Sequence, residues 1–177
     1  SIALLVAIPS SLAQPFVGHW SAQHVARHQP AKLAAMEAQF VTERGAPLRI
    51  GGWPDPATGT VTGALEIPGG LSFLAFDDPT AEVAGLDRVP RADWPNVRVV
   101  HVAFQVMVAL GTYLALVSLW AAWAMWRGRG WAAHRLLLLA LVAAGPMGLI
   151  AIEAGWVVTE VGRQPWIIQG LVRTADA

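Results

Sequence analysis

Two polar side chains, Lys32 and Glu37, stand out in the string QPAKLAAME at residues 29–37, which follows a hydrophobic stretch. They are five positions apart, so on a straight helix they point about 140° away from each other and form no i,i+4 ion pair. Two polar heads beside Leu33 and Met36 suit a ligand that joins a polar ring to an apolar tail. Lys32 would orient a ring oxygen, and Glu37 would accept a proton. A solvated amphipathic helix is the alternative that the spacing alone favours.

Met107 is the second residue with a candidate chemical role. It lies about eight residues inside a long apolar run, or roughly 12 Å from the outer end of that run. Ala103 one turn above and Gly111 one turn below leave a shallow face against which a flat macrocycle could lie. A thioether sulfur is a competent haem ligand, and with histidine it gives a low-spin electron-transfer site. The alternative is ordinary packing, which is the role of most buried methionines.

Glu153 is a carboxyl inside a second apolar run, about five residues or roughly 7 Å from its outer end. Ionisable groups at such positions are costly and usually functional. Glu160 lies two turns further on and on nearly the same face. One interpretation is that Glu153 binds a metal centre, which would lie in the same outer half as a Met107 site. The other is a helix-packing contact through a protonated carboxyl.

A compact turn near the end of the chain is bounded by Arg163 and Trp166 and fixed by Pro165. Arg163 could pair with Glu160 or with a haem propionate. We favour a structural role for this turn, because arginine is ordinary at a membrane surface. Trp156 suits either packing against a haem or anchoring at the interface.

Histidines offer a weaker candidate for metal binding. His24 and His28 share a helical face, whereas His19 does not. Without a third ligand nearby, we do not favour a metal site there. His101, at the outer end of the run that holds Met107, is expected to be an interfacial histidine, with contact to a haem propionate as the alternative.

The composition indicates a membrane protein. Of the 177 residues, 55% are hydrophobic and 14% are charged, and the mean hydropathy is +0.47. The formal net charge of +0 gives no reason to expect a nucleic-acid partner. The absence of cysteine excludes disulfides, thiolate metal sites and haem attached through thioethers. Several of the nine Trp flank apolar runs, as interfacial anchors do.

Apolar runs define the elements that position these residues. Two of them exceed the roughly 20 residues that cross a bilayer, and the short basic loop between them belongs on the cytoplasmic side. We therefore predict an all-α membrane protein, a fragment of a transmembrane helix bundle with an outer-side loop region. Its parts are the outer part of a transmembrane helix (1–17), the outer loop region (18–98), a transmembrane helix (99–126), a cytoplasmic loop (127–130), a transmembrane helix (131–161) and an outer segment (162–177).

The outer loop region is predicted to have two parts. Residues 20–40 have helical character, interrupted at Pro30. Residues 42–95, rich in Gly, Pro, Asp and Thr, predict short strands, turns and loops, with short apolar pieces such as 71–76. Pro146 is predicted to kink the last helix near its middle.

Four segments, taken together and in order, resemble subunit I of the cytochrome bd family of terminal quinol oxidases. They are QPAKLAAME at 29–37, FQVM at 104–107, EAGW at 153–156 and GRQPW at 162–166. The resemblance implies that residues 29–37 open a quinol-binding loop, here of the short kind, in which Lys32 and Glu37 bind and oxidise quinol. It also implies that the chain is a fragment, because the family's subunit has helices before Ser1 and after Ala177.

The resemblance further implies haem roles. Met107 would bind the iron of a low-spin haem b, with a histidine partner upstream of Ser1, and Glu153 the iron of a high-spin haem b. The ligand of a third haem, haem d or another haem b, would also lie upstream. Gln105, Trp156 and Arg163 would contact these cofactors. Many relatives have Arg at the position of Gln105, and Gln cannot compensate propionate charge. Relatives can have Trp at the position of Leu149, so a role for that Trp does not carry over.

The expected function is part of a membrane quinol:oxygen oxidoreductase. Quinol, either ubiquinol or menaquinol, would be oxidised at the outer loop, and electrons would pass through the haems to reduce oxygen to water. The expected partners are subunit II and the lipid bilayer, in a bacterial-type inner membrane that the chain crosses several times, with residues 18–98 outside. The fragment alone is expected to be inactive. The alternative is a haem-depleted quinone-binding or structural membrane subunit, which haem absorption in the purified protein would distinguish.

Overall fold

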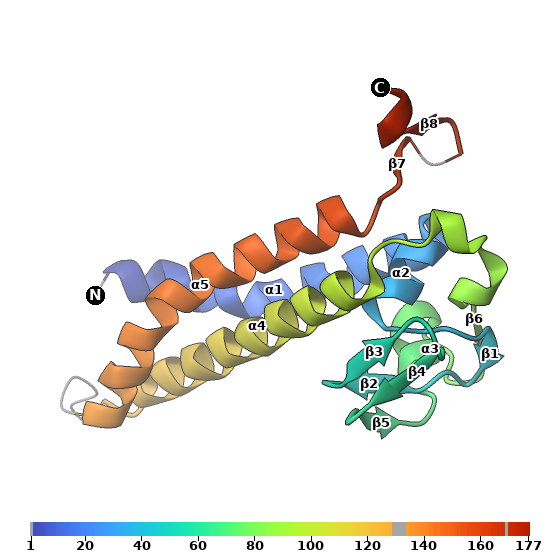
Figure 1. The fold of residues 1–177 in the computed structure, drawn as a ribbon. Helices are drawn as coiled ribbons and strands as arrows, with labels where there is room; N and C mark the ends of the chain where they lie inside the picture. The colour runs from blue at the N-terminus through green and yellow to red at the C-terminus, as the bar shows by residue number, and fades with distance from the viewer. Residues whose placement is uncertain (1, 129–133, 169) are drawn as a thin grey trace. The chain divides into compact units, whose positions relative to one another are not determined.

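Three long helices dominate the computed structural model, which describes residues 2–128, 134–168 and 170–177. They are α1 (Ile2–His28), α4 (Val97–Trp126) and α5 (Arg135–Val161) (Figure 1). All three are long and apolar enough to cross a membrane. At 1.5 Å per residue they are about 40–45 Å long. Part of the predicted cytoplasmic loop 127–130 and the predicted start of the last helix at residue 131 lie outside the described residues.

Helix α1 extends well beyond the apolar stretch at residues 1–17. It continues to His28, because residues 19–28 contain neither Gly nor Pro to interrupt it. Pro30 then begins a short second helix, α2 (Pro30–Met36), at the first helical position, where its missing N–H is not needed. The predicted interruption at Pro30 is therefore confirmed.

The described chain forms two compact units. The first contains the residues up to Gly18 together with Val106–Ala154, and its described part is helical apart from the residues next to the α4–α5 loop. Ala121, Ala124 and Leu137 form a small buried cluster there. The hydroxyl of Tyr113 donates to the carbonyl oxygen of Ala140 at 2.9 Å. This unit thus has few buried side chains of its own.

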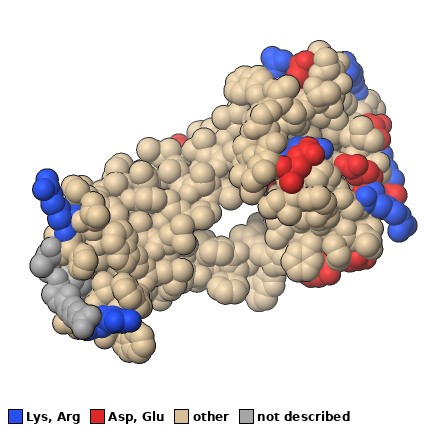
Figure 2. Space-filling model, turned by 90° about the horizontal axis from the view of Figure 1, so that it is seen from below, with Lys and Arg blue, Asp and Glu red and all other residues tan. Residues whose placement is uncertain are grey.

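Large apolar side chains cover the outside of the first unit. Leu116, Val142 and Ile152 are exposed. The space-filling view shows long helical surfaces that are mostly tan, the colour of residues other than Lys, Arg, Asp and Glu (Figure 2). Helices that are apolar on their outer faces need lipid or other protein around them.

The second unit contains His19–Gln105 together with Gly155–Ala177. Its sheets are four antiparallel strand pairs, three of which nest one inside another along the chain. The pairs are β1 (Glu43–Arg44) with β6 (Glu82–Val83), β2 (Leu48–Ile50) with β5 (Leu65–Ile67), β3 (Trp53–Asp55) with β4 (Thr60–Thr62), and β7 (Trp166–Ile168) with β8 (Val172–Arg173). The described residues of this unit also form the 3₁₀ turns η1 (Leu86–Arg88), η2 (Arg91–Asp93) and η4 (Thr174–Asp176).

One apolar piece of this region differs from the prediction. Residues 71–76 form most of a helix, α3 (Gly70–Phe76), where strands, turns or loops were expected. The reason is the i,i+4 spacing of Leu71 and Ala75, which places both on one face. That face packs in a buried cluster with Ala46 and Val83.

A larger buried cluster holds α2 in place. Ala34 and Met36 of α2 pack there with Val100 near the start of α4 and with Val158 near the end of α5. Leu86 of η1 belongs to the same cluster. The position of α2, and with it the position of the neighbouring Glu37, is therefore fixed by this packing.

Candidate functional site

Glu37 is the C-cap residue of α2, where its backbone N–H donates to the carbonyl oxygens of Leu33 and Ala35, and its side chain is buried, with 4% of the residue exposed. Its Oε2 atom has no hydrogen-bond partner among the described residues. Burial raises the pKa of Glu37 from 4.5 to about 7, and the positive charge of Arg49 opposes the rise. A carboxyl with a pKa in this range can both take up and release a proton at neutral pH.

Arg49, on strand β2, is the cation whose charge acts on Glu37. Its Nη1 donates to Oε1 of Gln39 at 2.7 Å, and its Nε donates to Oε1 of Glu66 at 2.9 Å. Gln39 is itself buried and donates to Glu43 at 2.8 Å. The guanidinium is thus held in one place by two partners, and it is the cation that favours the ionised form of Glu37. Neither Arg49 nor Gln39 was predicted from the sequence.

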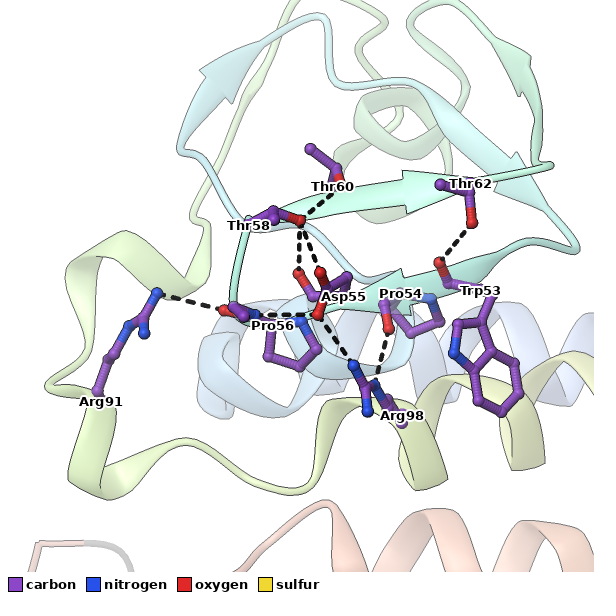
Figure 3. Close-up of polar contacts among 10 residues, drawn as sticks. Trp53, Pro54, Asp55, Pro56, Thr58, Thr60, Thr62, Arg91 and Arg98 are labelled. Carbon is purple, nitrogen blue, oxygen red and sulfur yellow. Dashed lines mark hydrogen bonds and ion pairs between the residues drawn. The ribbon is translucent and has the colours of Figure 1, made fainter.

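One face of α4 holds the chain that carries Arg49. Nε2 of Gln105 donates to the carbonyl oxygen of Arg49 at 2.9 Å, and its Oε1 accepts from the N–H of Gly51 at 3.0 Å. Two turns earlier, Arg98 donates to the carbonyl oxygen of Pro54 at 3.2 Å and to Asp55 at 2.9 Å (Figure 3). These side chains of α4 therefore bind the backbone and turn residues of β2 and β3.

His101 lies between Arg98 and Gln105 on the same face of α4 and is fully buried. Its ring nitrogens lie next to the carbonyl oxygens of Met36 and Gly51. The expectation of an interfacial histidine is therefore wrong, because residues 36–51 fold over the beginning of α4. The side-chain amide of Gln105 binds the backbone of Arg49 and Gly51. The predicted contact between Gln105 and a haem did not include this role.

Lys32 faces a cavity of about 450 Å³ and is half-buried. The cavity is lined by polar and aromatic residues that include Gln29, Asp93, Arg163, Gln164 and Trp166. The pKa of Lys32 is lowered, first by burial and then by the positive charge of Arg163, while Glu160 opposes the change. No hydrogen bond or ion pair is seen for the Lys32 ammonium within the described chain. A polar group of a ligand would find a donor there.

The spacing of Lys32 and Glu37 thus has a structural consequence. Lys32 lines the cavity, whereas Glu37 is buried and is not among the residues that line it. The two side chains have different surroundings, as the divergence of about 140° predicts. Lys32 and Glu37 therefore do not contact the same atoms of one bound ligand.

The C-terminal turn also lines this cavity, through Gly162, Arg163, Gln164 and Trp166. Arg163 pairs with Glu160 at 2.5 Å, which is one of the two pairings considered from the sequence. Buried Gly162 lies against Lys32: a Cβ built at Gly162 would be 3.2 Å from Cγ of Lys32. Arg173 was missed by the sequence analysis; it stacks over Trp166 at 4.8 Å. The sequence could not have revealed this contact, because an Arg within ten positions of a Trp along the chain is a common arrangement.

His24 and His28 share a helical face, as predicted. Their rings stack with centroids 4.1 Å apart. Within the described ranges, no group of three or more His, Cys, Asp or Glu side chains could hold a metal ion. The His19 ring instead faces Asp77, with 3.6 Å between Nε2 and Oδ1.

A family model for cytochrome bd terminal oxidase subunit I matches residues 1–177. The chain belongs to this family. It is 41% identical over 178 residues to a putative cytochrome bd menaquinol oxidase subunit I of Bacillus subtilis, covering 99% of this chain and 39% of the relative. It is 30% identical over 227 residues to the cytochrome bd-II ubiquinol oxidase subunit 1 of Escherichia coli, covering 91% of this chain and 44% of the relative.

The structure agrees with this assignment. The bd oxidase of Geobacillus thermodenitrificans superposes with a TM-score of 0.85 at 40% sequence identity, over 99% of this chain and 40% of the solved chain. The mostly helical model with three candidate membrane spans matches a fragment of the helix bundle of a bd oxidase. This chain spans about two fifths of the length of these relatives. The family is one of respiratory quinol oxidases, for which haem, quinol and a second subunit are typical.

The residues suggested as haem ligands fit that cofactor. Glu153 is exposed on α5, and no hydrogen bond or ion pair joins it to another described residue. A carboxylate on an apolar helix needs a partner, and ferric iron is one. Met107 is half-buried on α4, and a Cβ built at neighbouring Gly111 would meet no atom within 4 Å. Open space beside a thioether is what a flat macrocycle requires.

Proposed function

We propose that this chain forms the quinol-oxidising and haem-binding part of a membrane quinol:oxygen oxidoreductase. The observation that carries the proposal is the buried carboxyl of Glu37, which has an unpartnered oxygen and a pKa near 7. Oxidation of a quinol releases protons, and such a carboxyl can receive one at neutral pH. Family membership supports the same reaction class.

Lys32 and Glu37 would have different roles, Lys32 in binding the quinol and Glu37 in accepting a proton. In our proposal the quinol ring binds in the cavity beside Lys32, whose ammonium donates to a ring oxygen. Glu37 does not line this cavity, so in our proposal it receives the proton only after the proton has left the ring, and Arg49 opposes a further rise of its pKa. Trp166 and Arg163, the latter paired with Glu160, also line this cavity and limit where the ring can lie.

Met107 would hold a low-spin haem b and Glu153 a high-spin haem b. When bound, these haems and a third one (haem d or another haem b) carry electrons from quinol to oxygen, which is reduced to water. Trp156 is exposed on α5 and available for contact with a cofactor. For Gln105 we propose instead the role that its contacts support, which is to hold strand β2.

The setting we propose is a bacterial inner membrane, with the second unit on the outer side. Subunit II and the remaining helices of subunit I would cover the exposed apolar faces of the long helices together with lipid. The quinol would be ubiquinol or menaquinol, the substrates that name the relatives.

Replacement of Lys32 by Ala in the full-length oxidase is expected to raise the KM for quinol about 10-fold, or by ~1.4 kcal/mol of binding. The physical reason is the loss of the only ammonium on the cavity lining within the described residues. Arg27→Ala is the matched control, because Arg27 is an exposed cation in the last turn of α1 and does not line the cavity. Steady-state oxygen consumption against quinol concentration measures both. Equal KM values for the Lys32 variant and the parent would contradict the binding role.

Glu37→Gln is expected to lower kcat about 100-fold and to remove a pH dependence. In the parent, the Glu37 carboxyl is protonated below pH 7 and cannot accept a proton, so activity should rise as the pH increases through about 7. The amide does not titrate, so the variant should lack this acid limb. Haem absorption should stay unchanged. An unaltered pH–rate profile in the variant would exclude Glu37 as the acceptor.

The stability of the protein provides an independent check of the Glu37 pKa. A carboxyl whose folded pKa is raised from 4.5 to about 7 makes the fold less stable as the pH rises from 4.5 to about 7, by up to about 3 kcal/mol. The loss is complete above pH 7 and absent below 4.5. Glu37→Gln should remove this part of the pH dependence, as thermal unfolding at several pH values would show.

A further inference from the structure

Asp93 is the one carboxylate among the described residues that line the Lys32 cavity. It is the last residue of the turn η2, where its N–H donates to the carbonyl oxygen of Pro90 at 2.8 Å. The next residue, Trp94, is anchored through its indole N–H, which donates to the carbonyl oxygen of Val89 at 2.8 Å. The fold of its own segment therefore holds Asp93 beside the cavity.

Arg173 fixes one oxygen of this carboxylate. Its Nη2 donates to Oδ1 of Asp93 at 2.5 Å, and its guanidinium stacks over the ring of Trp166 at 4.8 Å. Arg173 is the register partner of Trp166 in the β7–β8 pair. The N–H of Thr174 adds a hydrogen bond of 2.9 Å to the carbonyl oxygen of Pro165. The Arg173 guanidinium is thus held in place by its strand pair and by an aromatic ring that also lines the cavity.

The other oxygen of Asp93, Oδ2, is available to a ligand. No hydrogen bond joins it to another residue of the described chain. The side chain keeps 17% of its surface exposed, so a molecule in the cavity can reach it. A carboxylate oxygen only accepts hydrogen bonds, whereas the ammonium of Lys32 only donates them. The cavity therefore offers one acceptor and one donor, both charged, to a bound ring.

These two groups respond differently to the redox state of a quinol. Each hydroxyl of a quinol both donates and accepts hydrogen bonds, whereas each carbonyl oxygen of the quinone only accepts them. Lys32 can therefore donate to either form. Asp93 can bind only the reduced form, because a carbonyl oxygen beside its Oδ2 would bring two acceptors together with no proton between them. A hydrogen bond to an ionised acceptor is also about twice as strong as one between neutral groups.

We propose that Asp93 makes the cavity selective for quinol over quinone, because it accepts a hydrogen bond from a quinol hydroxyl and repels the carbonyl oxygen that replaces it. The inference rests on the proposed function, in which quinol binds beside Lys32. Oxidation removes two electrons, which pass to the haems, and both hydroxyl protons, which leave for the solvent, one of them by way of Glu37. The quinone then lacks a donor for Asp93 and is released. Arg173 is the positioning residue, since it holds Oδ1 and leaves Oδ2 to the ligand.

Asp93→Asn in the full-length oxidase tests this selectivity. The amide oxygen can still accept from Arg173, and the amide nitrogen then takes the place of Oδ2, so that an acceptor becomes a donor. The probes are ubiquinol and menaquinol with short side chains, together with their quinones. We expect the KM for quinol to rise about threefold and the Ki of quinone, as a competitive inhibitor, to fall about 10-fold. Oxygen consumption at several fixed quinone concentrations gives both constants.

Asp77→Asn is the matched control. Asp77 is exposed, does not line the cavity, and accepts a hydrogen bond of 2.8 Å from Gln23, which an amide oxygen can also accept. Its φ of +58 is one that Asn tolerates. The control should keep both constants. If Asp93→Asn leaves the ratio of Ki for quinone to KM for quinol at the parent value, the proposal is overturned.

A measurement on the parent oxidase does not depend on the folding of any variant. In isothermal titration calorimetry with the same probes, quinone should bind the oxidised parent at least about 10-fold more weakly than quinol binds the anaerobically reduced parent. Equal affinities for the two forms would overturn the proposal even if Asp93→Asn fails to assemble with its haems.

Lys32→Ala keeps this test separate from the proposed function. If Lys32→Ala raises both constants while Asp93→Asn leaves their ratio unchanged, the binding cavity stands and the inference about Asp93 alone is wrong. If neither substitution changes either constant, quinol does not bind in this cavity, and the role of Asp93 fails with the proposed site. If Lys32→Ala raises both constants and Asp93→Asn moves them in opposite directions, both proposals are supported.

Discussion

Glu153→Gln in the full-length oxidase is expected to abolish the high-spin haem b and, with it, oxygen consumption. Glutamine has the size and hydrogen-bonding capacity of a protonated glutamic acid but lacks the anionic oxygen that binds ferric iron. Removal of groups that merely support a metal ligand already lowers metal affinity 10–100-fold, so loss of the ligand itself should cost at least about 100-fold. Haem stoichiometry by pigment extraction, measured beside oxygen consumption, provides the readout.

The competing explanation for Glu153 is packing through a protonated carboxyl. Glu153 is exposed and bonds to no other described residue, so a packing partner would have to come from helices outside this chain. Glu160→Gln is the matched control: it is the same substitution on the same helix, but Glu160 already has Arg163 as its partner. The control should keep its haems. Full haem content and normal turnover in Glu153→Gln would rule out the ligand assignment.

The long helices could be predicted from hydropathy, whereas the C-terminal limit of α1 could not. An apolar run shows how much of a helix suits a membrane, and it identifies α4 to within two residues at its start. A helix does not stop where its apolar part stops. In α1 the polar residues 19–28 remain helical until Pro30 prevents continuation.

The folding of residues 42–95 depends on contacts that have no period in the sequence. The nested pairs β1–β6, β2–β5 and β3–β4 are two or three residues long, too short for an alternating pattern to reveal. A backbone requirement helps to fix them: Gly52 has φ +94, and a Cβ there would be 2.7 Å from Val61. Such a requirement becomes visible only when the partner strand is known.

In the candidate site, too, some features could be predicted from the sequence and others could not. Its residue types and the divergence of Lys32 from Glu37 follow from the sequence, because helical geometry is regular. The surroundings of Glu37 do not, because Arg49 comes from a strand whose position depends on contacts with Gln39 and Gln105 that are distant in the sequence. Burial of His101 was mispredicted for this reason. A histidine at the end of an apolar run looks interfacial until the segment that covers it is known.

Met107→Leu is expected to remove the low-spin haem b signal while leaving the fold intact. Leucine preserves volume and apolarity, so the change in packing should cost less than about 1.5 kcal/mol. Leucine has no sulfur to bind iron, so the reduced low-spin band should disappear or acquire high-spin character. Quinol oxidation should fall at least about 100-fold, since an electron-transfer centre would be lost. Reduced-minus-oxidised spectra and oxygen consumption measure the two effects.

Met125→Leu separates ligation from packing in this experiment. Met125 lies on the same helix, α4, eighteen residues further on, and is half-buried like Met107. Eighteen residues are five full turns, so the two methionines share a face of the helix. A general sensitivity of α4 to loss of methionine would affect both variants equally. Loss of the low-spin band in Met107→Leu alone would identify the ligand, whereas an unchanged band would assign Met107 to ordinary packing.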